Sequence, residues 1–213
     1  MSAKDKDCGH HDDDDYSQFL RRLAILVLGL IVIVGLVVLI VWAVLHPSKP
    51  NFMLQDVTVF GLNATSSPAN LLSLSMQVTI SSRNPNDRIG VYYTSMDVYG
   101  AYRGQQVTLP TLLPSTYQGH RDVVVWSPFL SGDAVPVAPD VALSLQQDRN
   151  VGALLFNVKI DGRVKWKVGS WISGRYHLIV NCPALIRYGK PGNAVAVGTA
   201  TKFQIVQTCN VEV

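Results

Sequence analysis

The chain begins with a hydrophobic pattern that differs from everything after it. Leu23 to Leu45 form an unbroken run of 23 uncharged residues, most of them Leu, Ile, Val, Ala or Gly. As a helix, this run would span about 34 Å, enough to cross a hydrocarbon core of about 30 Å. A buried helix would need a larger soluble protein around it, and a cleaved signal peptide would have a shorter apolar core. The pattern therefore predicts a transmembrane helix over 23–45, preceded by a polar, disordered tail over 1–22.

After a proline-containing linker over 46–51, apolar and polar residues alternate, as in strands with one buried face and one solvated face. The alternating runs are 52–60, 72–82, 95–103, 122–126, 154–160, 164–168, 176–182 and 202–213. Asp161-Gly162 lies between two runs and indicates either a hairpin turn or a bulge in one long strand. Only residues 141–147 favour a short helix. The pattern predicts one mainly β domain over 52–213, an antiparallel β-sandwich of the fibronectin type III or immunoglobulin-like Greek-key type.

Charge gives the predicted anchor a direction and describes the domain that follows. Arg21 and Arg22 directly precede the apolar run, and the positive flank of a membrane helix stays in the cytosol. The domain is then expected on the extracellular or lumenal side. The net charge of +3 hides a basic domain, because residues 46–213 hold fourteen basic and nine acidic residues, a formal +5. Such a surface is either ordinary or suited to polyanions such as acidic wall polysaccharide or lipid headgroups, and nucleic acid is not expected there.

Two features of the domain fit an oxidising, glycosylating compartment. Asn63-Ala64-Thr65 is an acceptor sequence for N-glycosylation. Cys182 and Cys209 both lie in the domain, where they can form a disulfide. Two buried free thiols are the alternative.

The domain carries no recognisable catalytic, cofactor or metal motif. His177 falls on the polar side of its run and is expected to be exposed. The unusual segment is a turn-forming one, and its members are Asn84, Pro85, Asn86, Asp87 and Arg88. This turn either joins two strands and packs its neighbours into the core, or forms an exposed recognition loop.

Several linked segments together resemble a plant family. They are Asn84 to Tyr93, Tyr117 to His120, Trp126 to Phe129, Asp161 to Gly169, Gly174 to Leu178, and Cys182-Pro183. In order and spacing they are similar to the harpin-induced and non-race-specific disease resistance-like proteins, whose outer domain is a late embryogenesis abundant group 2 domain. The resemblance covers nearly the whole chain.

This resemblance implies a fibronectin-like sandwich at the plasma membrane, a role in defence against pathogens, and no catalysis. The expected partners are the lipid bilayer and a wall polysaccharide or membrane protein. Other members of the family are linked to plasmodesmata, senescence or abiotic stress, so a stress-protective protein is the alternative. The founding member's Asn-Gly-Asp motif is absent here, and the chain ends without the apolar tail of a lipid-anchor signal. Adhesion through that motif and a glycolipid anchor are therefore not expected.

Overall fold

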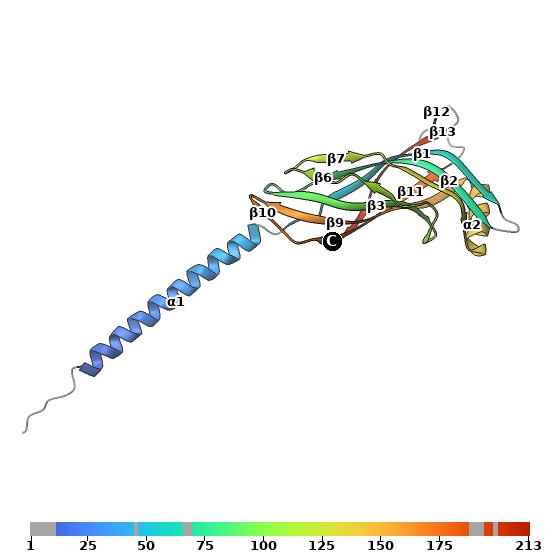
Figure 1. Cartoon of the computed structure of the whole chain (residues 1–213). Helices are drawn as coiled ribbons and strands as arrows, with labels where there is room; N and C mark the ends of the chain where they lie inside the picture. Colours follow the sequence, from blue (N-terminus) through green and yellow to red (C-terminus); the bar gives the residue numbers. More distant parts are fainter. Residues whose placement is uncertain (1–11, 45–46, 66–69, 188–193, 198–199) are drawn as a thin grey trace, which may run out of the picture. The chain divides into compact units, whose positions relative to one another are not determined.

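The computed structural model describes residues 12–44, 47–65, 70–187, 194–197 and 200–213. They belong to two compact units, one helical within Met1–His46 and one β-rich over Pro47–Val213 (Figure 1). Each unit is described by itself below.

The first unit is the single helix α1, Asp12–Val44. Its stretch Gln18–Leu39 is long and apolar enough to cross a membrane, and none of it is buried against protein. This exposure is consistent with a membrane anchor.

The helix begins earlier than the sequence pattern predicts. Residues 12–22, which we assigned to a disordered tail, are helical, and this assignment was wrong for that segment. A helix extends readily into the residues before it once it has formed, because nucleation is the costly step. Residues 1–11 and the end of the predicted span at Leu45 lie outside the described residues.

The second unit consists mainly of two antiparallel β-sheets, which confirms the predicted fold class. The first sheet has the order β12 (Ala194–Val197), β13 (Ala200–Thr208), β1 (Asn51–Thr65), β2 (Leu71–Arg83), β7 (Val123–Trp126), with β8 (Phe129–Pro136) also paired to β2. The second has the order β14 (Asn210–Glu212), β11 (Tyr176–Arg187), β9 (Ala153–Val168), β3 (Ile89–Tyr102), β4 (Gln105–Gln106). Three further short strands pair with strands of this sheet. They are β5 (Thr111–Leu113) and β6 (Thr116–Gln118), which pair with β3, and β10 (Trp171–Ile172), which pairs with β9. The Greek-key type stays a prediction.

The apolar faces of the two sheets share one core. Along β2 every second side chain from Leu72 to Ile80 is buried, as the alternation predicts. Aromatic rings pack between the two sheets. Phe52 stacks on Trp126, which also belongs to the first sheet, and makes an edge contact with Tyr93 of the second sheet. The Tyr93 hydroxyl is buried between the sheets, where it donates to Gln118 Oε1 at 2.8 Å. Burial raises the pKa of Tyr93, so this hydroxyl stays neutral and keeps its donor role.

The sequence left open whether Asp161-Gly162 is a hairpin turn or part of one long strand, and strand β9 decides between the two. It is one continuous strand with no hairpin at Gly162, and its register with β11 is unbroken there. The irregularity lies on the other neighbour, where β3 has one extra residue between Tyr93 and Ser95. Gly162 is required because a Cβ at that position would meet the Ser95 carbonyl oxygen at 2.7 Å. The outward face of β9 is therefore presented without interruption.

The remaining differences from the sequence pattern are local. The predicted helix at 141–147 is longer, α2 (Pro139–Val151), with proline in its first turn and Gly152 in the left-handed conformation at its end. The predicted strand at 202–213 is two strands, β13 and β14, which belong to different sheets. Strand β8 was not predicted.

Candidate functional site: an arginine groove on the second sheet

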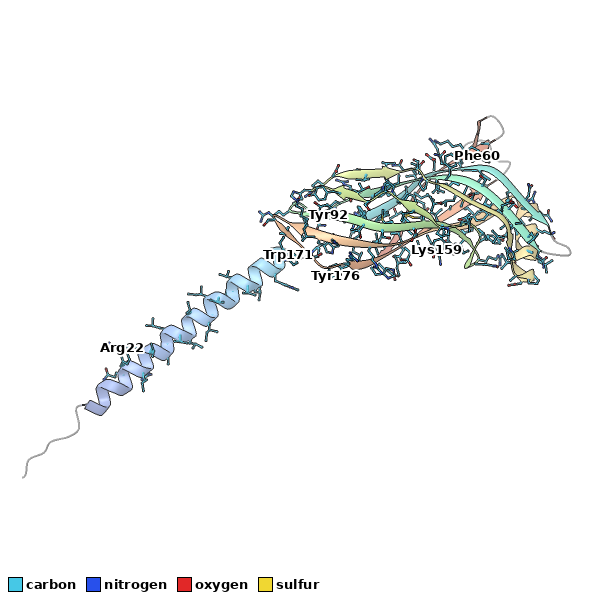
Figure 2. The ribbon with its side chains drawn as sticks, in the orientation of Figure 1. Arg22, Phe60, Tyr92, Lys159, Trp171 and Tyr176 are labelled. Carbon is cyan, nitrogen blue, oxygen red and sulfur yellow. A yellow bond between two sulfur atoms is a disulfide. The ribbon has the colours of Figure 1, made fainter. Side chains whose placement is uncertain are left out.

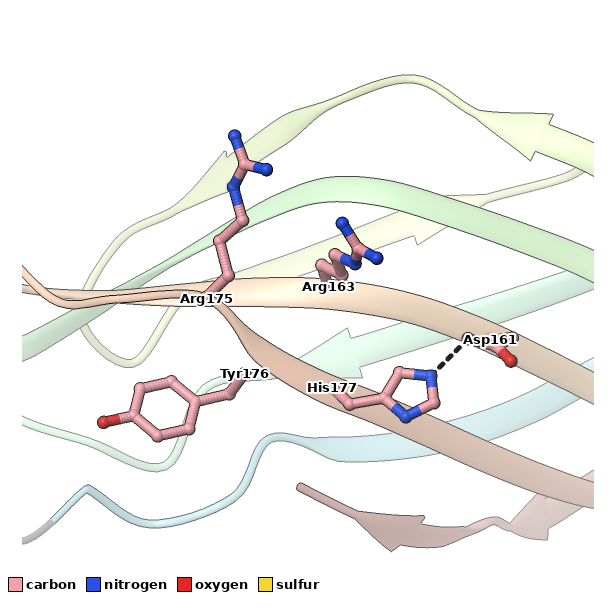
Figure 3. A pocket seen from close by; sticks show the side chains of 5 residues that line it. All are labelled: Asp161, Arg163, Arg175, Tyr176 and His177. Atoms are coloured by element: carbon pink, nitrogen blue, oxygen red, sulfur yellow. Dashed lines mark hydrogen bonds and ion pairs between the residues drawn. The ribbon is translucent and has the colours of Figure 1, made fainter.

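An open hollow of about 360 Å³ lies on the solvent face of the second sheet (Figure 3). We call it the arginine groove, and it is lined by Asp161, Arg163, Arg175, Tyr176 and His177. Strand β9 supplies the first two residues. The start of β11 and the residue before it supply the other three.

Strand pairing assembles the groove from two separate parts of the sequence. The two-residue period points Asp161 and Arg163 outward from β9, with buried Ile160 and Val164 facing the core. The antiparallel register places His177 directly opposite Arg163. Neighbours across a strand pair lie about 5 Å apart, so side chains fourteen residues apart in sequence meet on one surface.

An ion pair occupies one side of the groove. His177 Nε2 lies 2.6 Å from Asp161 Oδ1, and both side chains are more than half exposed. The carboxylate is thus engaged by the histidine. Asp97 of β3 lies opposite Asp161 on its other side, so this side of the groove is acidic.

Two arginines, Arg163 and Arg175, make the other side of the groove basic. Arg163 and Arg175 extend their guanidinium groups toward the same side of the strands (Figure 3), and both are exposed. Neither has an ion-pair partner among the residues that the structure describes. A guanidinium presents planar, paired donors that match a carboxylate, phosphate or sulfate. Two such groups side by side can therefore hold one anion or two successive anions of a polymer.

Aromatic and basic side chains continue along the same face. Tyr176 borders the groove with nearly half of its surface exposed. Farther along, Lys167 Nζ lies 5.2 Å from the Tyr117 ring centre and 5.9 Å from that of Tyr92. Figure 2 labels Tyr92 and Tyr176 toward the end of the domain where Trp171 lies, and Lys159 nearer the middle. Exposed rings beside cations are common where proteins bind sugars or other flat, polar ligands.

Of the described side chains that line the groove, none is a serine, threonine or cysteine, which are common nucleophiles in covalent catalysis. Within the described part of the chain, no three His, Cys, Asp or Glu side chains gather as metal ligands.

The predicted recognition loop is in large part a structural turn. Asn84 is fully buried, and its Nδ2 donates to the carbonyl oxygens of Ile89 at 2.7 Å and Gly119 at 2.8 Å. Asn86 is buried too, and its side-chain amide forms paired bonds with the backbone of Ser48, at 2.8 and 2.9 Å. These two asparagines fasten the start of the domain to the turn, so at these two positions the structure favours the strand-joining turn over the exposed recognition loop.

The other three members of the turn differ in exposure. Pro85 is half-buried, whereas Asp87 and Arg88 are exposed. Asp87 forms an ion pair with Arg121, and this hydrogen-bonded guanidinium lowers the pKa of the Asp87 carboxyl. Asp87 is therefore already paired, which leaves Arg88 as the one side chain of this turn that is both exposed and without a hydrogen bond or ion pair among the described residues.

The remaining predicted sites lie where their chemistry can occur. Cys182 and Cys209 lie at disulfide distance, with their Cα atoms 4.3 Å apart. Cys209 stands between β13 and β14, so the bond joins β11 to the point where the chain passes from one sheet to the other. Asn63 is an exposed residue of β1. Its glycosylation stays a prediction.

From the sequence alone, Asp161, Arg163 and Arg175 were not identified as binding residues. His177 alone was noted, as an exposed residue, and it is exposed. The available signal was the polar face of β9, which reads Asp161, Arg163, Lys165 and Lys167 at alternate positions. That row shows a basic stripe. It does not show which strand lies beside it, and the groove needs both strands.

Comparison with known proteins agrees with the family resemblance that the sequence shows. The sequence profile described as "Late embryogenesis abundant protein" matches residues 79–182. NDR1/HIN1-like protein 1 of Arabidopsis thaliana is 47% identical over 209 residues, which cover 98% of this chain and 100% of that protein. NDR1/HIN1-like protein 12 of the same plant is 44% identical, covering 98% and 99%. From this full-length identity, the chain belongs to the NDR1/HIN1-like family of late embryogenesis abundant proteins.

Proposed function

We propose that this chain is a non-enzymatic, single-pass plasma-membrane protein that acts in plant defence. Its helix α1 would cross the membrane with the N-terminus in the cytosol. Its β domain would face the cell wall and bind an anionic wall polymer or a partner protein there. The apolar helix, the arginines before it and the defence-related names of the relatives support this role.

The binding proposal rests on the two arginines of the arginine groove, Arg163 and Arg175, which have no ion-pair partner among the residues that the structure describes. A cation that has no acidic partner within its own fold is available to an external anion. Tyr176 at the border adds an exposed ring on which a sugar can stack. A polymer of uronic acids offers both features, a ring and a carboxylate, in every residue.

The expected affinity of one groove is low. Exposed ion pairs contribute little individually because water and salt screen them. A polymer compensates by offering many identical sugars to many anchored copies, which raises the effective concentration of the second contact. The interaction should therefore weaken steeply with salt and with shorter oligomers.

Binding to de-esterified polygalacturonate tests this proposal. We expect the full-length protein in detergent to bind the immobilised polymer, and the double variant Arg163→Gln/Arg175→Gln to bind roughly tenfold more weakly. The matched control is Arg83→Gln/Arg149→Gln, which removes two exposed charges outside the groove.

The control separates a site from a general charge effect. If both double variants lose affinity equally, the basic surface as a whole binds, and the groove is not a site. If neither double variant loses affinity, the polymer is not the ligand of the arginine groove, and a protein partner becomes the better candidate for the groove.

A further inference from the structure

The hairpin from β9 to β10 ends in two large apolar residues that the core does not use. Trp171 is 63% exposed and Ile172 is 47% exposed. Gly169, with φ +59°, allows the tight turn, after which Trp171 pairs with Val168 and Ile172 with Lys167. We call Trp171 and Ile172 the Trp-Ile tip. These two side chains of β10 are large and apolar yet exposed, so the tip is an apolar surface that the core of the domain does not explain.

The tip lies at the end of the domain where the chain enters. Val168, the partner of Trp171, also pairs with Ile89 of β3. Ile89 follows Asn86 by three residues, and Asn86 binds the backbone of Ser48. Figure 1 shows β10 at one end of the β-rich unit and α2 at the other.

The covalent chain limits how far this end can lie from a bilayer that α1 crosses. Val44 is the last helical residue, and Ser48 follows it by four positions. Four extended residues span at most about 14 Å. The polar headgroup layer on each side of a bilayer is itself about 6 Å thick. The entry end of the domain is therefore held within reach of the lipid headgroups, whichever way the helix crosses.

We propose that the Trp-Ile tip inserts into the lipid headgroup layer beside the anchor and fixes the orientation of the domain on the membrane. Tryptophan prefers the membrane interface because its ring is apolar and its N–H stays hydrogen-bonded. Exposed Arg88 directly precedes Ile89 at the same end and can bind lipid phosphate. This inference rests on the anchor in the proposed function. It does not depend on the arginine groove.

Quenching of tryptophan fluorescence by brominated lipid tests the contact. The full-length protein is reconstituted into phosphatidylcholine vesicles, either plain or brominated near the top of the acyl chains. Four tryptophans emit, and Trp126 and Trp166 are buried in the core. The variants Trp171→Phe and Trp42→Phe then report the tip and the anchor separately. We expect each substitution to remove part of the emission that bromine quenches.

A matched control moves the tryptophan to the other end of the domain. Leu143 on α2 is 60% exposed, close to the exposure of Trp171. In the double variant Trp171→Phe/Leu143→Trp, the new tryptophan should emit equally in plain and brominated vesicles. This comparison separates contact at the tip from a general approach of the domain to lipid.

Each other outcome overturns the inference in a distinguishable way. Quenched emission that is lost with Trp42→Phe but unchanged by Trp171→Phe would show an anchored protein whose tip stays off the membrane. Emission from Trp171 that is blue-shifted yet not quenched would show that a protein surface, such as a second copy, covers the tip. An unquenched Trp42 would contradict the anchor itself, and the tip contact with it.

Discussion

Removing the disulfide between Cys182 and Cys209 is expected to lower the free energy of unfolding of the β domain by about 3.5 kcal/mol. The bond joins residues 27 positions apart, and in the chain-entropy model a closed loop of that length restricts the unfolded chain by this amount. It also holds the chain where it leaves β13 for β14. The measurement is urea unfolding of the full-length protein in detergent, followed by tryptophan fluorescence, for the wild type and for Cys182→Ala/Cys209→Ala.

Two controls isolate the bond from the loss of the sulfur atoms. Dithiothreitol should bring the wild type down to the stability of the double variant and leave the double variant unchanged. Cys8→Ala removes the third cysteine and should have no effect on the transition. A wild type that is equally stable with and without reductant would show that the two cysteines are free thiols in the protein.

Asn84→Ala is expected to destabilise the domain by about 3 kcal/mol, because it leaves several buried polar groups without partners. The Asn84 amide donates to the carbonyl oxygens of Ile89 and Gly119, and its Oδ1 accepts from the backbone N–H of Asn86 at 3.0 Å. An alanine replaces none of these bonds, and the site is fully buried from water. Urea unfolding of the variant measures the effect.

Arg88→Ala is the matched control within the same turn. Arg88 is exposed, so its removal should change the unfolding free energy by less than about 0.5 kcal/mol. The reverse ranking, a tolerant Asn84 and a sensitive Arg88, would contradict the structural role of the turn. It would favour the recognition loop that the sequence left open.

The sequence predicted best those parts of the fold in which burial follows a simple period. From Leu71 to Ile80 strand β2 alternates without exception, so both its existence and its buried face could be predicted. Strand β8 was missed because one of its buried positions is Gly132, where a Cβ would meet the Val107 carbonyl oxygen at 2.3 Å. A glycine that is buried because another backbone segment lies close to it breaks the apolar pattern. Only the packed structure shows why it is there.

The candidate site was harder to predict because each part of it depends on strand pairing. The alternation identified His177 as exposed, but only the register of β9 with β11 places it beside Arg163 and Asp161. The two alternatives for the turn could not be separated from the sequence for a related reason. Asn84 and Asn86 have the composition of a solvated turn, and their burial follows from backbone groups far along the chain, such as Ser48 and Gly119.

We propose a β domain that lies outside the cell on a single membrane anchor, and protease accessibility tests this topology most directly. Protease is added to intact protoplasts that carry the full-length protein with a different tag at each terminus, after the protein has been located at the plasma membrane. We expect the C-terminal tag to be digested and the N-terminal tag to be protected. A protected C-terminal tag at that membrane would place the domain in the cytosol and contradict the proposed topology.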